Sequence, residues 1–153
     1  RQMSFRDMVG ANGRVSFFNN AGSGHLVVDV VGWFPDGGYG ALTPERLLDT
    51  RRTGGRLGAG GRVDLQVTGR GGVPSSGVGA VVLNVTSTEA SAPSFVTVWP
   101  AGETRPTASA LNTEPGQDTP NLVIARVGAS GRVSLYNNAG TGHLVADVVG
   151  WFG

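Results

Sequence analysis

Residues 129–152 read ASGRVSLYNNAGTGHLVADVVGWF, and residues 11–34, which lie 118 positions earlier, read ANGRVSFFNNAGSGHLVVDVVGWF. Only five of the 24 positions differ between these two copies. Near-identical copies at a fixed spacing are typical of tandem-repeat proteins. The sequence therefore predicts one complete β repeat module over residues 35–153. Residues 1–34 are predicted to be the C-terminal strands of a preceding repeat, packed as an extra β-hairpin because a two-stranded unit is marginal in water.

Each copy has the pattern of two strands joined by a reversal. Residues 132–137 alternate apolar and polar side chains, which is the period of a β-strand. The Asn- and Gly-rich residues at 137–142 tolerate the positive φ that turns require. Residues 143–152 are apolar at nearly every position, which is typical of a central strand covered on both faces. We therefore predict a β-hairpin in each copy. Counting alternate positions along the second strand of the first copy places five residues on one face, namely His25, Val27, Asp29, Val31 and Trp33.

The rest of the repeat is rich in turn residues and has only short apolar segments. The chain holds 26 glycines and 8 prolines among 153 residues, and no segment has helical periodicity. Residues 35–43 are predicted to be a Gly-rich connection that leads into a short apolar segment at 44–52. Further strand-like segments, separated by turn signals, follow at 63–67, 80–88, 94–99, 109–113 and 122–127.

Together these segments predict an all-β fold with about eight strands per repeat. We expect an antiparallel two-sheet β-sandwich, because short strands separated by many Gly- and Pro-rich turns are typical of that architecture. A β-trefoil is the alternative, since the repeat length of 118 residues divides into three units of about 39. The sequence has no threefold similarity inside the repeat, which favours the sandwich.

Composition argues against several kinds of partner. The formal net charge is +1, so no strong overall field attracts nucleic acid or an anionic membrane. No apolar run approaches the roughly 20 residues of a membrane-spanning helix. Cysteine is absent, which rules out disulfides, thiolate catalysis and thiolate zinc sites.

Several segments together resemble a repeat family found in secreted and surface proteins of actinobacteria. The resemblance covers nearly all of residues 44–152, with 4–34 as a partial copy. It implies an extracellular, modular protein whose repeats are accessory modules, arranged in tandem or attached to secreted hydrolases. The segments that carry it are RLLDTR (46–51), GRGGVP (69–74), AVVLNVT (80–86), TVWPAGETRP (97–106), SALN (109–112), NLV (121–123) and VSLYNNAGTGHLVADVVGWF (133–152).

No set of residues has the spacing of a catalytic or metal site. His143 and Asp147 share one strand face but are four residues apart, or about 13 Å along a strand, and the same holds for His25 and Asp29. No nucleophile elbow accompanies either pair. The acidic residues of the loop at 114–118 lack the spacing of an EF-hand, so a polar turn is the better interpretation. We therefore predict no catalysis, no cofactor and no metal.

Two aspartates are predicted to form structural ion pairs. Asp29 and Asp147 are flanked by valines in strands that are predicted to be covered, and a buried carboxylate needs a charged or hydrogen-bonding partner. Arg51 is a candidate partner, because a guanidinium group binds a carboxylate through two parallel hydrogen bonds. Asp49, in the same LLDTR segment, either caps a turn or pairs with an arginine itself.

Aromatic residues are the candidates for ligand binding. Trp99, Tyr136 and Trp151 offer rings on which a sugar could stack. Trp99 stands at a strand end beside Pro100, where either an exposed platform or core packing is possible. Core packing is favoured for Trp151, since large aromatic residues dominate the cores of small domains.

These observations predict a secreted, non-catalytic β module at the cell surface or outside the cell. The leading hypothesis is binding of a surface polymer, namely a polysaccharide or cell-wall polymer. The alternative is a structural repeat of an extracellular stalk or fibre, a homo-oligomer that assembles through β-strand contacts. Nucleic acid and membrane-spanning roles are not expected.

Overall fold

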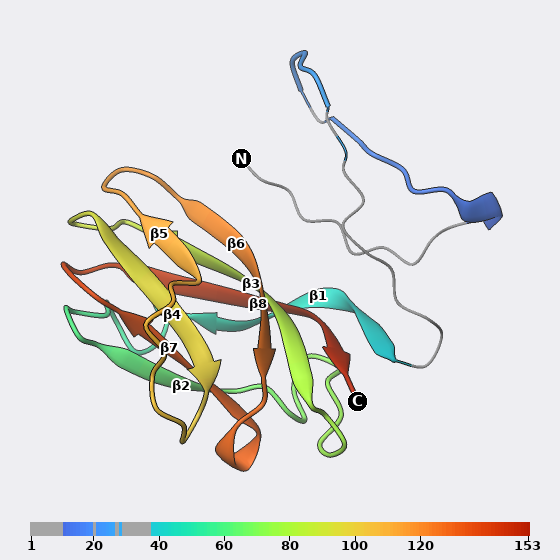
Figure 1. Cartoon of the computed structure of the whole chain (residues 1–153). Helices are drawn as coiled ribbons and strands as arrows, with labels where there is room; N and C mark the ends of the chain where they lie inside the picture. Colours follow the sequence, from blue (N-terminus) through green and yellow to red (C-terminus); the bar gives the residue numbers. More distant parts are fainter. Residues whose placement is uncertain (1–10, 20, 27, 29–37) are drawn as a thin grey trace.

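The computed structural model describes residues 11–19, 21–26, 28 and 38–153. Residues 39–152 form two four-stranded antiparallel sheets packed face to face (Figure 1). The first sheet has the order β1 (Tyr39–Asp49), β8 (His143–Phe152), β3 (Ala80–Thr88) and β6 (Thr119–Arg126). The second has the order β2 (Arg62–Gln66), β7 (Arg132–Asn137), β4 (Ser94–Pro100) and β5 (Leu111–Thr113). The predicted eight-strand sandwich is confirmed, and the β-trefoil alternative is wrong.

The core lies between the inner faces of the two sheets. Alternate residues of β3 and β8 supply one side, because successive side chains of a strand point to opposite faces. Alternate residues of β7, β4 and β2 supply the other. The largest fully buried members of this core are Val67, Val81, Leu83, Val85, Val96, Val133, Leu135 and Val148. None of the helices in the described part of the chain is long and apolar enough to span a membrane.

Strand β8 is central, as its two apolar faces predict. It pairs with β1 on one side and with β3 on the other. Its alternation is interrupted by an irregularity, because Leu83 faces Val148 while Val82 faces Gly150. This β-bulge inserts one extra residue, and the side chains beyond it change face. Trp151 therefore packs against the core with its partner Val81, and not on the face that counting alternate positions predicts.

The predicted β-hairpin of residues 129–152 is wrong. Strand β7 pairs with β2 and β4 in the second sheet, whereas β8 belongs to the first sheet. The segment at 138–142 passes from one sheet to the other. The Asn137 side chain donates hydrogen bonds to the carbonyl oxygens of Ala139 and Gly140, and Leu57 exchanges backbone hydrogen bonds with Gly142. The sequence thus correctly predicts a turn between the two strands, but this turn connects strands of different sheets.

Strand β1 begins earlier than the sequence predicts. The Gly-rich residues 39–43 belong to this edge strand, which runs to Asp49. Pro44 interrupts the pairing with β8, since the register shifts between Ala41 and Glu45. Proline is tolerated at edges and bulges because it cannot donate a backbone hydrogen bond. Because glycine and proline have low β propensity, the sequence pattern alone does not predict this part of the strand.

The first copy of the repeated stretch differs from the second in its surroundings. Among its described residues, Ala11–Gly13 form a 3-10 turn and none belongs to a strand. All side chains described over 12–28 are exposed, including Phe18 and Leu26. The remaining residues of the predicted extra hairpin, among them 1–10 and 29–34, lie outside the described residues. The predicted packing of 1–34 therefore stays a prediction.

Candidate functional site

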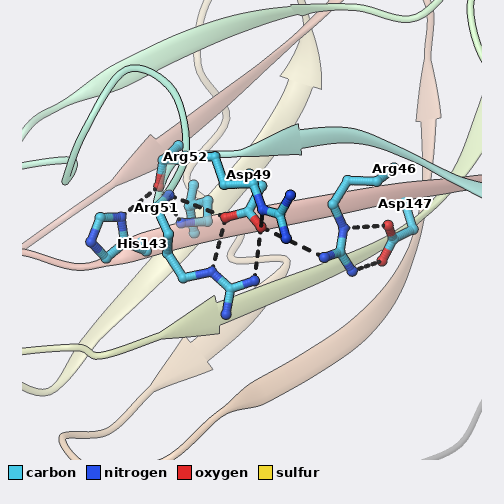
Figure 2. Close-up of polar contacts among 8 residues, drawn as sticks. Arg46, Asp49, Arg51, Arg52, His143 and Asp147 are labelled. Atoms are coloured by element: carbon cyan, nitrogen blue, oxygen red, sulfur yellow. Dashed lines mark hydrogen bonds and ion pairs between the residues drawn. The ribbon is translucent and has the colours of Figure 1, made fainter.

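Charged side chains gather at the end of β1, on the outer face of the first sheet (Figure 2). Strand β1 supplies Arg46 and Asp49, the following turn supplies Arg51 and Arg52, and β8 supplies Asp147. Asp147 faces away from the core because its neighbours Ala146 and Val148 point into it. We call these five residues the arginine–aspartate cluster.

Arg46 and Asp147 form the ion pair between the two strands of the cluster. They stand directly opposite each other in the β1–β8 register. Arg46 Nε donates to Asp147 Oδ1 at 2.8 Å, and Arg46 Nη2 donates to Oδ2 at 3.1 Å. The hydrogen bond to Asp147 raises the pKa of Arg46. The partner of Asp147 is thus Arg46 and not Arg51, because the register brings Arg46 alongside and Arg51 lies beyond the end of the strand.

Asp49 organises the turn that follows β1. Its Oδ1 accepts the backbone N–H of Arg51 at 3.1 Å and Arg51 Nε at 2.9 Å, and its Oδ2 accepts Arg51 Nη2 at 2.8 Å. Arg46 Nη1 and Arg52 Nε lie farther from Oδ2, at 3.6 and 3.8 Å. Hydrogen bonds from the Arg51 side chain hold the pKa of Asp49 well below its ordinary value. Asp49 therefore both caps the turn and pairs with an arginine.

His143 is held by Thr50 rather than by an acidic residue. His143 Nδ1 lies 3.0 Å from Thr50 Oγ1, and both side chains are buried. Thr50 Oγ1 also accepts the backbone N–H of Leu144 at 3.0 Å, and the Thr50 N–H donates to the Leu144 carbonyl oxygen. The imidazole thus helps to fasten the end of β1 to β8. Because Asp147 is bound to Arg46, His143 and Asp147 do not form a catalytic pair.

Trp99 is not an exposed platform. It lies on the outer face of the second sheet, but only 4% of its surface is exposed. Its Nε1 donates to the carbonyl oxygen of Glu103 at 3.0 Å. The loop that follows β4 folds back over this face, so a sugar ring cannot reach the indole. The sequence around Trp99 gives no indication that the loop after β4 covers the indole ring.

The other two aromatic candidates are also engaged within the domain. Tyr136 lies beside Thr97 in the register of the second sheet, and the Arg105 guanidinium carbon stands 4.0 Å from the centre of its ring. Such a contact is a cation–π interaction, and it occupies one face of the ring. Trp151 packs against the core. Of the three predicted ligand-binding residues, Trp99 is buried, Trp151 is half-buried against the core, and Tyr136 has one ring face occupied by Arg105.

A shallow groove of about 520 Å³ runs beside the arginine–aspartate cluster. Arg46 is half exposed there, and Arg52 is 84% exposed and only loosely held by Asp49. The groove therefore offers guanidinium donors and carboxylate acceptors to a polar ligand. Its lining consists of Pro44, Arg46, Leu47, Leu48, Asp49, Arg52, Thr53 and Asp147.

Sequence reasoning found part of this site and missed the rest. Asp49, Arg51 and Asp147 were predicted ion-pairing residues, whereas Asp29 lies outside the described residues. Arg46 and Thr50 were missed, although both belong to the RLLDTR segment. Their roles follow from the β1–β8 register, which a sequence without its strand pairing does not contain. Within the described part of the chain, no group of three or more His, Asp or Glu residues is suited to hold a metal ion.

The fold and the cluster together define an all-β sandwich domain with a network of ion pairs on one sheet. The sequence matches no known protein-family model and no curated protein.

Replacing Asp147 should measure what the Arg46 pair contributes. Asp147→Ala removes two charge-assisted hydrogen bonds, but 48% of the Arg46 side chain is exposed, so water can solvate the freed guanidinium. We expect the free energy of unfolding at pH 7 to fall by roughly 1–2 kcal/mol, less than the about 3–5 kcal/mol of a fully buried pair.

Urea unfolding measures this loss, and Glu103→Ala is the matched control. Glu103 pairs with Arg126 on the open surface, so its loss should change stability by no more than about 0.5 kcal/mol. If Asp147→Ala behaves like Glu103→Ala, the Arg46 pair has no structural importance.

The lowered pKa of Asp49 predicts an acid-sensitive contribution to stability. A proton binds more easily to this carboxylate in the unfolded chain than in the folded one, so the contribution is complete above the ordinary pKa of 3.8 and is lost as pH falls further. In Asp49→Asn the contribution is absent at every pH. The difference in urea midpoint between wild type and Asp49→Asn should therefore be large at pH 6 and shrink toward pH 2. A difference that stays constant over this range would contradict the assignment.

Proposed function

We propose that this chain is a non-catalytic structural module of an extracellular stalk or fibre, in which copies of one sandwich follow one another. The observation that carries the proposal is that the sequence of the stretch that contains β7 and β8 occurs twice. The same 24-residue stretch returns 118 positions away with five changes, and residues 39–152 hold one complete eight-stranded sandwich. A unit that completes its own core and recurs at a fixed period supplies length.

Exposed apolar side chains of the first copy support assembly through this segment. Phe18 is 83% exposed and Leu26 is 64% exposed. Exposed large apolar side chains are candidates for contact with another molecule when they form a contiguous surface. Because their counterparts in the second copy lie in strands, contact between chains through strand pairing is the mode that this segment favours.

The contacts of the predicted binding and catalytic residues also favour a structural role. Trp99 and Trp151 contribute to packing, and Arg105 covers one face of Tyr136. His143 is bound to Thr50. The extracellular location in this proposal is based on the resemblance to repeats of secreted and surface proteins.

Self-association should depend on the exposed apolar residues of the first copy. Light scattering of the wild-type chain over about a hundredfold range of concentration should show a rising mass, as mass action requires. Phe18→Ser combined with Leu26→Ser should keep the chain monomeric without lowering its melting temperature, because both side chains are exposed.

Ile124→Ser is the matched control, since Ile124 is an exposed apolar residue on the edge strand β6 and outside the repeated stretch. It should leave association unchanged. Loss of association in Ile124→Ser alone would assign the contact to the sheet edge, and a wild-type mass that is independent of concentration would overturn assembly altogether.

Polymer binding at the groove is the second candidate function. It is favoured by Arg52, whose guanidinium is exposed beside the half-exposed Arg46 and fits carboxylate groups of a cell-wall polymer. If the groove binds, the chain is retained on insoluble peptidoglycan and not on cellulose. Arg52→Ala then abolishes retention with an unchanged melting temperature. Absence of retention on peptidoglycan, chitin and cellulose would exclude this candidate.

A further inference from the structure

We propose that the outer face of the second sheet carries a binding site for an acidic sugar, which residues 104–109 cover in this structure. We call these residues the strap. In this site Tyr136 supplies the ring on which the sugar stacks, Thr97 supplies a hydroxyl group, and Arg105 supplies the guanidinium that binds the sugar carboxylate. The site is formed by β4, β7 and the connection between β4 and β5, whereas the arginine–aspartate cluster lies on the first sheet. It therefore depends neither on assembly through the first copy nor on the groove beside that cluster.

Thr97 and Tyr136 stand side by side on the outer face. They are direct partners in the β4–β7 register. Both neighbours of Thr97 in β4, Val96 and Val98, pack into the core, so Thr97 points the other way. Directly opposite residues of an antiparallel pair have Cβ atoms about 4.5–5.5 Å apart on one face of the sheet. A ligand that stacks on the Tyr136 ring is therefore within reach of the Thr97 hydroxyl group.

The Thr97 hydroxyl group is buried without a partner. Only 1% of this residue is exposed, and within the described part of the chain its Oγ1 has no hydrogen-bond partner. Ser134 on the same face is equally buried, but its Oγ donates to Asp64 Oδ1 at 2.6 Å. A buried hydroxyl that lacks a partner is destabilising, and valine has nearly the same shape without this cost. The hydroxyl of Thr97 is therefore explained by a partner that the closed fold does not supply, and a sugar hydroxyl is suited to that role.

The strap is anchored at both ends and loosely held between them. Strand β5 pairs with the first half of β4, so the connection from the end of β4 returns along this strand (Figure 1). Trp99 Nε1 anchors the start through its hydrogen bond to the Glu103 carbonyl oxygen. The Ala110 N–H anchors the end by donating to the Val96 carbonyl oxygen at 2.7 Å. Within the described part of the chain, residues 104–109 are all exposed and form no hydrogen bond, and a segment with so few contacts opens at a small cost in free energy.

Arg105 is the strap residue that covers Tyr136. Its guanidinium carbon lies 4.0 Å from the ring centre, and the residue is exposed, where a cation–π contact is weak. Among the described residues no carboxylate pairs with Arg105, and the nearby Glu103 is bound to Arg126 instead. A guanidinium group binds a carboxylate through two parallel hydrogen bonds. Arg105 therefore has the capacity to bind an anionic ligand.

These contacts select for a sugar that carries a carboxylate. A sugar ring can stack on this face of Tyr136 only when Arg105 leaves it. The carboxylate then binds the displaced guanidinium and replaces the lost cation–π contact with a charge-assisted pair. A neutral sugar displaces Arg105 without giving it a new partner, so it gains less from binding. Since every ligand must offset the cost of opening the strap, this difference decides which sugars bind.

Thr97→Val tests the hydroxyl group in the full chain, with soluble alginate oligosaccharides as the probe. These chains of uronic acids should bind the wild-type chain in isothermal titration calorimetry, and neutral dextran oligosaccharides should not. Thr97→Val should weaken alginate binding roughly threefold to tenfold, the contribution of one hydrogen bond. It should melt no lower than wild type, because the closed fold gives the hydroxyl no partner.

Thr113→Val is the matched control. Thr113 is the other fully buried hydroxyl without a partner in the described part of the chain, but it faces the core as Leu111 does in the same strand. Thr113→Val should also melt no lower than wild type, and it should bind alginate unchanged. Unchanged alginate binding in Thr97→Val, or an equal loss in Thr113→Val, would overturn the proposal.

Variants of Arg105 and Tyr136 test the other two contacts. Arg105→Ala should lose the preference for alginate over dextran, because the carboxylate no longer has a partner. Tyr136→Ala should abolish binding, whereas Tyr136→Phe keeps the ring and should bind like wild type. Arg52→Ala, in the groove of the first sheet, should leave alginate binding unchanged. Loss of binding in Arg52→Ala with full binding in Arg105→Ala would place the sugar in the groove and overturn the proposal, as would absence of alginate binding by the wild-type chain. Neither result bears on assembly, which light scattering measures.

Discussion

The burial of both faces of β8 is the constraint on which the rest of the structure depends. Residues of this strand face the core on one side, and Val145 and Val149 are buried on the other. A strand of this kind is unstable at an edge or alone, so β1 and β3 must flank it. The bulge at Val149 then turns Trp151 into the core at the end of the strand. Removing this strand would divide the first sheet and expose the middle of the core.

The arginine–aspartate cluster follows from the same strand. Asp147 lies on the outer face between apolar neighbours, and a carboxylate there requires a charged partner. Arg46 meets it only in one register of β1 against β8, because a slip by one residue would turn the side chains of β1 to the opposite face. A partly exposed ion pair of this kind stabilises the fold less than a fully buried one. Their value here lies in fixing the register of an edge strand that Pro44 interrupts.

The sequence predicts those features that depend on local periodicity, and misses those that depend on which strands meet. Alternation predicted the strands, and the apolar faces of residues 143–152 predicted a central strand. The sequence pattern does not show that β7 and β8 belong to different sheets. A turn within one sheet and a turn from one sheet to the other use the same types of residue. The covering of Trp99 by the loop at Glu103 depends on tertiary contact. The sequence alone does not distinguish Arg46 from Arg51 as the partner of Asp147, because the choice depends on the register of β1 against β8.

The five differences between the two copies of the repeated stretch divide by their place in the sandwich. Three of them correspond to turns or half-exposed positions of the second copy, namely Ser130, Tyr136 and Thr141. The other two correspond to Leu135 and Ala146, which are fully buried and whose counterparts Phe17 and Val28 are larger. Protein cores are closely packed, so a larger side chain at either site would require the neighbouring strands to shift. The two copies therefore differ physically in core volume more than in their turns or their surface.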